Sequence, residues 1–239
     1  MHKLFRFSLF NKIADILLPW LIISLIASLA AGLYFALYNS PPDYQQGDSV
    51  RIMYVHVPVA SLSLAIYVFM AVCSVSYIIW RNPLSAIICY CSAPIGMIYC
   101  IICIITGAIW GYPIWGAWWV WDARLTSMLI LLFFYFGYIL LYNSFTDEKQ
   151  SAFMSSCLLI IGVVNVPIVK FSVDWWSSLH QPASILRSGG MAIHSSMLYP
   201  LFIMMAFFTI FYLTTLIISV KQIKNNKIIA RNSAMLYNS

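Results

Sequence analysis

Long apolar runs, rather than an alternation of apolar and polar positions, dominate this chain. Six runs have the length of about 17–25 residues or more that a helix needs to cross a bilayer, and none contains Asp, Glu, Lys or Arg. They cover residues 16–38, 57–80, 86–110, 125–142, 152–169 and 191–220. No alternating ten-residue pattern suggests a transmembrane barrel. The pattern predicts an all-α membrane protein, a six-transmembrane-helix bundle that forms a single membrane domain over residues 1–239.

Two details qualify this bundle. The last run is longer than a bilayer requires, so we expect it to tilt or to begin as helix above the membrane surface. The basic residues are distributed unequally: nine lie at the chain ends and in the second and fourth connections, against four in the other three connections. Because basic residues favour the cytoplasmic side, both termini are expected in the cytoplasm. Residues 39–56, 111–124 and 170–190 then face outward.

Composition supports the membrane assignment and limits the possible partners. Hydrophobic residues make up 62% of the chain and charged residues 8%, whereas soluble domains have about 45–50% and 25%. This excludes a water-soluble fold and makes the lipid bilayer a partner. The net charge of +6 is spread over short connections and a tail, so we expect no nucleic-acid partner. All six cysteines lie in apolar runs, where they are expected to pack as small hydrophobic residues.

Tryptophan is concentrated in the second outward connection. Five of the nine tryptophans fall between Trp110 and Arg124. An interfacial aromatic belt is the simplest explanation, but a belt would spread its rings over all helix ends. If residues 115–124 are helical, Trp115, Trp118, Trp119 and Asp122 share one face. Such a shelf of rings predicts a large planar aromatic ligand, since offset-stacked aromatic pairs contribute roughly 0.5–1.5 kcal/mol beyond area burial.

Charged residues and histidines beside this connection add candidate contacts. Arg124 suits either a lipid phosphate or Asp122 as its partner, or else a carboxylate of the ligand. His56 and His180 flank the tryptophans from the first and third outward connections, and imidazole is a common haem-iron ligand. We therefore expect His56 and His180 to fill both axial positions of a porphyrin. His194 is either a reserve ligand or a polar packing residue.

Three segments together resemble the haem exporter protein C family of cytochrome c maturation (system I), within the wider tryptophan-rich WWD haem-handling proteins. They are residues 51–58 (RIMYVHVP), 115–126 (WGAWWVWDARLT) and 175–181 (WWSSLHQ). The resemblance implies a six-span inner-membrane protein with a Trp-rich periplasmic haem-binding loop. It also implies non-covalent, transient binding of b-type haem with His56 and His180 as axial ligands. The implied haem-contacting residues are Trp115, Trp118, Trp119, Trp121, Asp122 and Arg124.

The resemblance also implies partners: a periplasmic haem chaperone that receives the haem, an ABC-type ATPase with its membrane subunits, and a small membrane accessory subunit. The chain has no G-x-x-x-x-G-K-[ST] loop, so any ATP hydrolysis belongs to a partner. We expect haem handling without a catalytic residue set. The main alternative is a haem-transporting permease subunit of an ABC complex. A b-type cytochrome would need His pairs deep within the spans, and a scaffold subunit would carry no haem.

Overall fold

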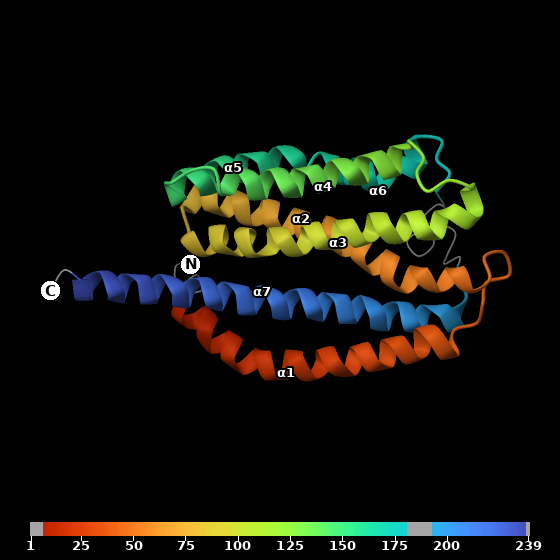
Figure 1. The fold of residues 1–239 in the computed structure, drawn as a ribbon, viewed down its shortest axis with the longest axis horizontal. Coiled ribbons are helices and arrows are strands. Elements are labelled where there is room, and N and C mark those ends of the chain that lie inside the picture. Colours follow the sequence, from red (N-terminus) through yellow and green to blue (C-terminus); the bar gives the residue numbers. More distant parts are fainter. Residues whose placement is uncertain (1–6, 181–192, 238–239) are drawn as a thin grey trace.

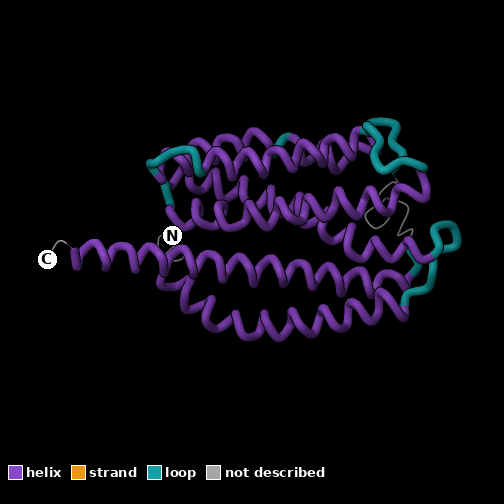
Figure 2. Tube along the Cα trace, viewed as in Figure 1, coloured by secondary structure: helices purple, strands orange, loops and turns teal. Residues whose placement is uncertain are grey.

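The structure is a computed structural model that describes residues 7–180 and 193–237, with side chains described for residues 9–180 and 193–226. Over these ranges it is helical and contains no strand (Figures 1 and 2). The elements are α1 (Phe7–Tyr34), the π-helix η1 (Phe35–Asn39), the 3-10 helix η2 (Asp48–Ile52), α2 (Met53–Trp80), α3 (Pro83–Trp115), α4 (Ala123–Tyr142), α5 (Glu148–Gly162), α6 (Asn165–Trp175) and α7 (Ser195–Tyr237). Six of the described segments are long and apolar enough to cross a membrane. The prediction of an all-α protein with six such helices is confirmed.

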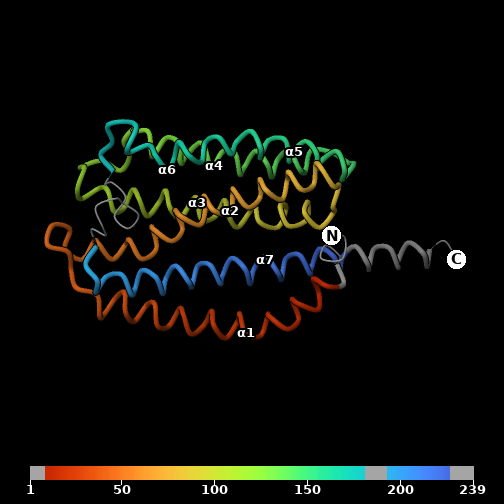
Figure 3. The backbone as a smooth tube through the Cα atoms, turned by 180° about the vertical axis from the view of Figure 1, so that it is seen from behind, coloured from red at the N-terminus to blue at the C-terminus, as the bar shows by residue number. Residues whose placement is uncertain are grey.

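The helices form two groups. Helices α2 to α6 pack into one bundle, while α1 packs mainly against α7, which lies between α1 and the pair α2 and α3 (Figures 1 and 3). Only a narrow seam of α1 and η1 is covered, including Ala14 and Ala36. Large side chains such as Ile16, Trp20 and Ile26 remain exposed. Because lipid is the solvent for such a surface, this exposure is expected of a transmembrane helix.

Tyrosine hydroxyls connect the helices within the apolar core. Tyr135 of α4 donates to the Ser63 carbonyl oxygen of α2 at 2.6 Å, and Tyr99 of α3 donates to the Phe208 carbonyl oxygen of α7 at 2.7 Å. Both side chains are almost fully buried. Without water in the bilayer core, each hydroxyl needs a partner inside the protein. These contacts therefore fix α4 against α2 and α7 against α3.

The helix bounds differ from the predicted runs at two places. The fifth span, from Glu148 to Trp175, is interrupted at residues 163–164 between α5 and α6. The last helix begins at Ser195 and continues to Tyr237, far beyond residue 220. Its length beyond the predicted run thus lies at its C-terminal end (Figure 1). The beginning of the predicted run, 191–192, lies outside the described residues.

Both ends of the described chain lie at the same end of the bundle (Figures 1 and 3). The opposite end carries the loop of residues 40–47, the loop of residues 116–122, and residues 176–180 after α6. We call it the Trp-rich end. It brings together the three connections that hold the candidate residues.

Candidate functional site at the Trp-rich end

The Trp-rich connection is a helix end, a short loop and a new helix start. Helix α3 continues to Trp115, and Gly116 closes it with φ +69°, donating its N–H to the Tyr112 carbonyl oxygen at 2.9 Å. A positive φ of this kind favours glycine after a helix. Asp122 then caps α4, accepting from the Leu125 N–H at 2.8 Å. Residues 115–124 do not form a continuous helix, so the condition for a single-faced shelf is not met.

The aromatic rings instead form separate pairs. Trp118 stacks on Tyr112 with ring centroids 4.3 Å apart and planes 18° apart. Trp119 meets Trp121 edge to face at 5.5 Å. Trp118 and Trp121 are 59% and 78% exposed, so they present open ring faces at this end of the bundle. Trp115 belongs to neither pair and lies 6.4 Å from the His180 ring.

His56 is held against α3 in the first turn of α2. Its side chain is buried, and its Nδ1 lies 3.1 Å from Thr106 Oγ1. The edge of Trp110, one turn further along α3, approaches the imidazole at a centroid distance of 5.6 Å. Gly107 lies between these two contacts, and a Cβ there would stand 3.0 Å from His56 Cε1. The glycine therefore lets the histidine ring pack directly on the α3 backbone.

The loop between α1 and α2 also contacts the residues around His56. Gln46 accepts a hydrogen bond from Trp110 Nε1 at 2.8 Å, so the loop between α1 and α2 is fastened to α3 beside His56. The backbone of the loop is closed by paired hydrogen bonds between Asp43 and Gly47. Gln46 thus fixes the orientation of the tryptophan that borders the His56 ring.

His180 lies across from His56, in the segment after α6. Its Nδ1 is 3.2 Å from Nη1 of Arg124. Arg124 also donates from Nε to Ser172 Oγ at 3.2 Å and from Nη2 to the Lys170 carbonyl oxygen at 3.3 Å. All three contacts join the start of α4 to α6 and the chain beyond it. No salt bridge joins Arg124 to Asp122 in the described part of the chain, so that predicted alternative is not observed.

Asp122 positions the His180 segment by a different route. Its second oxygen, Oδ2, accepts from Ser178 Oγ at 2.5 Å, and Ser178 Oγ accepts in turn from the backbone N–H of His180 at 3.0 Å. One carboxylate therefore caps α4 and tethers the chain that carries His180. This two-fold use gives a physical reason for an acidic residue directly before the fourth span.

The two histidines approach each other although 123 residues separate them in the sequence. Their ring centroids are 6.4 Å apart and their planes differ by 28°. Together they join the start of α2 to the segment after α6 at one point, with Trp110 beside one ring and Trp115 beside the other. The sequence predicts these residues on one side of the membrane, and the structure brings their rings within 6.4 Å of each other.

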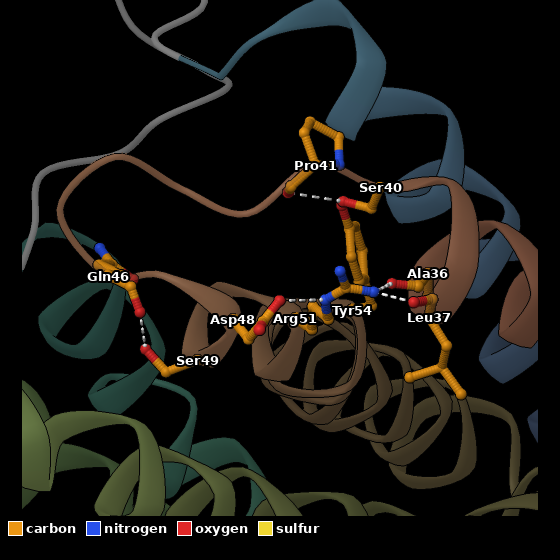
Figure 4. A network of polar contacts seen from close by, with 9 residues as sticks. All are labelled: Ala36, Leu37, Ser40, Pro41, Gln46, Asp48, Ser49, Arg51 and Tyr54. Atoms are coloured by element: carbon orange, nitrogen blue, oxygen red, sulfur yellow. Dashed lines mark hydrogen bonds and ion pairs between the residues drawn. The ribbon is translucent and has the colours of Figure 1, made fainter.

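The remaining candidate residues have other contacts. Arg51 of η2 binds the Ala36 and Leu37 carbonyl groups of η1 and forms a salt bridge with Asp48 at 3.0 Å, close to the contact between Ser40 and Tyr54 (Figure 4). It therefore joins η1 to η2. His194 is exposed and accepts from the Ser196 N–H at the start of α7. Arg187 and Met191 lie outside the described residues.

One polar atom at the site has no hydrogen-bond partner among the described residues. The indole nitrogen of Trp119 is buried without a hydrogen-bond acceptor among the residues that the structure describes. A buried donor left unpaired costs free energy, and an acceptor such as a ligand carboxylate would satisfy it. This is the kind of contact that a haem propionate offers.

Sequence reasoning did not find several of these residues. Thr106 and Gly107 lie in the third apolar run, where they read as ordinary helix positions, and no spacing distinguishes them. Ser172 and Ser178 are equally inconspicuous in the sequence. Gly116 and Asp122 did indicate a helix end and a helix start, because glycine favours helix C-termini and aspartate favours N-caps.

Comparisons with known proteins agree along most of the chain. The family model described as Heme exporter protein C matches residues 1–236. Heme exporter protein C of Bradyrhizobium diazoefficiens is 44% identical over 197 residues, which cover 82% of this chain and 74% of the relative. The putative cytochrome c biosynthesis ccmC-like mitochondrial protein of Marchantia polymorpha is 45% identical over 185 residues, 77% of each chain. Heme exporter protein C of Escherichia coli K12 is 44% identical over 170 residues, 71% of this chain and 69% of the relative.

Proposed function

Because this chain belongs to the Heme exporter protein C family, we propose that it binds haem at its Trp-rich end and passes it to a periplasmic haem chaperone. The family establishes haem handling in cytochrome c biogenesis by a multi-pass membrane protein. Binding at this end and delivery to the chaperone are the proposal. The observation that carries it is the approach of His56 and His180 beside Trp110 and Trp115, at the end of the bundle that also carries the exposed Trp118 and Trp121.

The separation of the two histidines supports iron ligation from both sides. Two metal–imidazole bonds of about 2 Å each, together with the half-width of each ring, require about 6 Å between ring centroids. The observed value is 6.4 Å. His56 and His180 would hold the iron, and the exposed faces of Trp118 and Trp121 would lie against the porphyrin by offset stacking. Haem is the cargo of this protein, so its binding and transfer require no nucleophilic side chain.

Charge and hydrogen bonding support a place for the propionates. Trp119 has a buried N–H without an acceptor in the described chain, and Arg124 carries a guanidinium group suited to carboxylates. Arg51, by contrast, is occupied in joining η1 to η2. We therefore assign propionate binding to Trp119 and Arg124 and not to Arg51.

The orientation and partners belong to the same proposal. We place the Trp-rich end in the periplasm and both termini in the cytoplasm of a bacterial inner membrane, since basic residues gather at the chain ends. An ABC-type ATPase, its membrane subunits and a small accessory subunit would supply the ATP-driven step. In this proposal haem is loaded from the periplasmic side, whereas a permease would load it from the cytoplasmic side.

The absorption spectrum of the purified protein with haem tests the ligands. Two histidine ligands predict a six-coordinate, low-spin spectrum, because each imidazole occupies one axial position. His56→Gly and His180→Gly should each abolish the six-coordinate form, and added imidazole should restore it. His194→Gly is the matched control, since His194 is an exposed histidine that contacts the start of α7. An unchanged spectrum in both of the first two variants would exclude this ligand pair.

A sealed-vesicle experiment tests the direction of loading. Haem added on the side of the Trp-rich end should bind to the protein at once, and haem enclosed on the other side should not. Loading from the enclosed side alone would favour the permease alternative.

A further inference from the structure

The hydrogen bonds around the two histidines specify where each imidazole carries its proton. A neutral imidazole has one N–H and one unprotonated nitrogen, and only the unprotonated nitrogen binds a metal. A partner that can only accept requires the N–H on its side of the ring, whereas a partner that can only donate requires the unprotonated nitrogen there. The partners of the two rings differ in this respect.

Thr106 acts as an acceptor toward His56. Its hydroxyl group has a single hydrogen, and Oγ1 lies 2.6 Å from the Ile102 carbonyl oxygen, the usual back-bond of a threonine within a helix. With its hydrogen committed to that carbonyl, Oγ1 accepts from His56 Nδ1, 3.1 Å away. His56 therefore carries its proton on Nδ1, and its Nε2 has the lone pair that a metal requires.

Arg124 acts as a donor toward His180. A guanidinium group has five N–H donors, no acceptor, and stays protonated in proteins. Its Nη1 lies 3.2 Å from His180 Nδ1, so Nδ1 accepts, and the neutral ring carries its proton on Nε2. Neither nitrogen of His180 is then ready to bind iron, since Arg124 covers one and a proton is attached to the other.

We infer that the two histidines are held in opposite tautomers, so that His56 binds the haem iron first and His180 binds only after Arg124 has left its Nδ1. The inference rests on the proposed function and adds an order to it. When His180 binds through Nε2, that proton is released to water and Nδ1 takes one up, so the charge of the ring is unchanged. Nδ1 then donates, which excludes the contact with Nη1 of Arg124.

The contacts of Arg124 allow this release without loss of its position. Its Nε–H and Nη2–H are bound to Ser172 and to the Lys170 carbonyl oxygen, so Nη1 can leave His180 while the rest of the guanidinium group stays at α6. Arg124 is thus a positioning residue for His180. The same reasoning makes His180 the ligand that is given up first, because return of Nη1 to Nδ1 restores the non-binding tautomer.

The tautomers are measured in the haem-free protein by nitrogen NMR of the full chain labelled with 15N-histidine. We expect an Nδ1–H tautomer for His56 and an Nε2–H tautomer for His180, each assigned from the variant that lacks that histidine. Thr106→Val, which keeps the shape and removes the acceptor, should convert His56 to a mixture, and Thr106→Ser should restore Nδ1–H. Arg124→Gln should release His180 from the Nε2–H form. An Nε2–H or averaged His56 in the unmodified protein overturns the inference.

Haem titration then tests the order of binding. His180→Gly should retain five-coordinate haem through His56, whereas His56→Gly should lose most of its affinity. Thr106→Val should weaken binding by about 10–100-fold, the range for residues that orient metal-binding histidines, and Thr106→Ser by much less. Thr209→Val is the control, because Thr209 makes the same back-bond on α7, to the Met205 carbonyl oxygen.

The outcomes separate the two proposals. Equal losses in His56→Gly and His180→Gly, with Thr106→Val unchanged, would remove the order and leave the ligand pair intact. An unaltered haem spectrum in both histidine variants would remove the ligand pair itself.

Discussion

Ser178 offers the clearest test of how His180 is positioned. The Ser178 hydroxyl joins the Asp122 carboxylate, 2.5 Å away, to the His180 N–H, 3.0 Å away. Ser178→Ala removes both contacts without replacing a proposed ligand. A hydrogen bond to a charged group contributes about 1.5–3 kcal/mol, and the half-buried position of Ser178 places the expected effect near the lower limit. Haem binding must then order the His180 segment itself, which costs about 1.5 kcal/mol, or roughly tenfold in affinity.

Asp122→Asn isolates the same tether from the helix cap. The amide oxygen of Asn can still accept from the Leu125 N–H, because Asn caps helices about as well as Asp. The amide group that faces Ser178 is a donor, so the contact of the serine hydroxyl with the carboxylate is lost. We expect the affinity of Asp122→Asn to fall about as far as that of Ser178→Ala. Asp122→Ala should additionally lose about 1 kcal/mol of capping free energy.

Affinities from haem titration and midpoints from thermal unfolding separate these effects. The double variant Ser178→Ala with Asp122→Asn should bind no more weakly than either single variant, since both remove one interaction. Ser144→Ala is the control. Ser144 follows α4 at the opposite end of the bundle, and its hydroxyl donates to the Leu140 carbonyl oxygen. Additive losses in the double variant, or unchanged haem affinity in Ser178→Ala, would refute the tether.

Three further variants have distinct expected results. Gly107→Ala should weaken haem binding by about tenfold, because its Cβ would stand 3.0 Å from His56 Cε1. Haem titration of Gly137→Ala is the control, since a Cβ at Gly137 contacts only Leu158. Trp119→Phe should lower haem affinity but leave the unfolding midpoint equal or higher, since it removes a buried donor that has no acceptor in the described structure. Arg51→Met should lower the free energy of unfolding by about 1–3 kcal/mol, as it releases η1 from η2, with haem affinity retained. Weaker haem binding at equal stability would contradict our placement of Arg51.

The spans could be predicted from the sequence because each is a long run without charge. The break at residues 163–164 and the extension of α7 to Tyr237 could not. Helix α7 continues through Lys221 and Lys224, whereas an apolar run ends at the first charged residue. Lys221 pairs with Asp15 of α1, and such a partner is visible only once the helices are packed.

The candidate site was predictable in its residue types and only partly in its geometry. His56 and His180 could be assigned to one side from the number of spans between them. Their approach to 6.4 Å depends on how α2 packs on α3 and how α6 packs on α4, which no local pattern records. The aromatic shelf was predicted wrongly because helical spacing was extended across Gly116 and Asp122, the residues at which helices end and begin.

The two sides of the site meet the opposite requirements of the proposed uptake and release of haem. His56 is buried in a regular helix and supported by Thr106, Gly107 and Trp110 of α3, so moving it would disturb the contact between two transmembrane helices. His180 lies in a segment without regular structure and is held by side-chain hydrogen bonds that can exchange one at a time. Local opening is easiest where few buried contacts must break. Release of haem is therefore expected to begin at His180, while His56 keeps its place on α3.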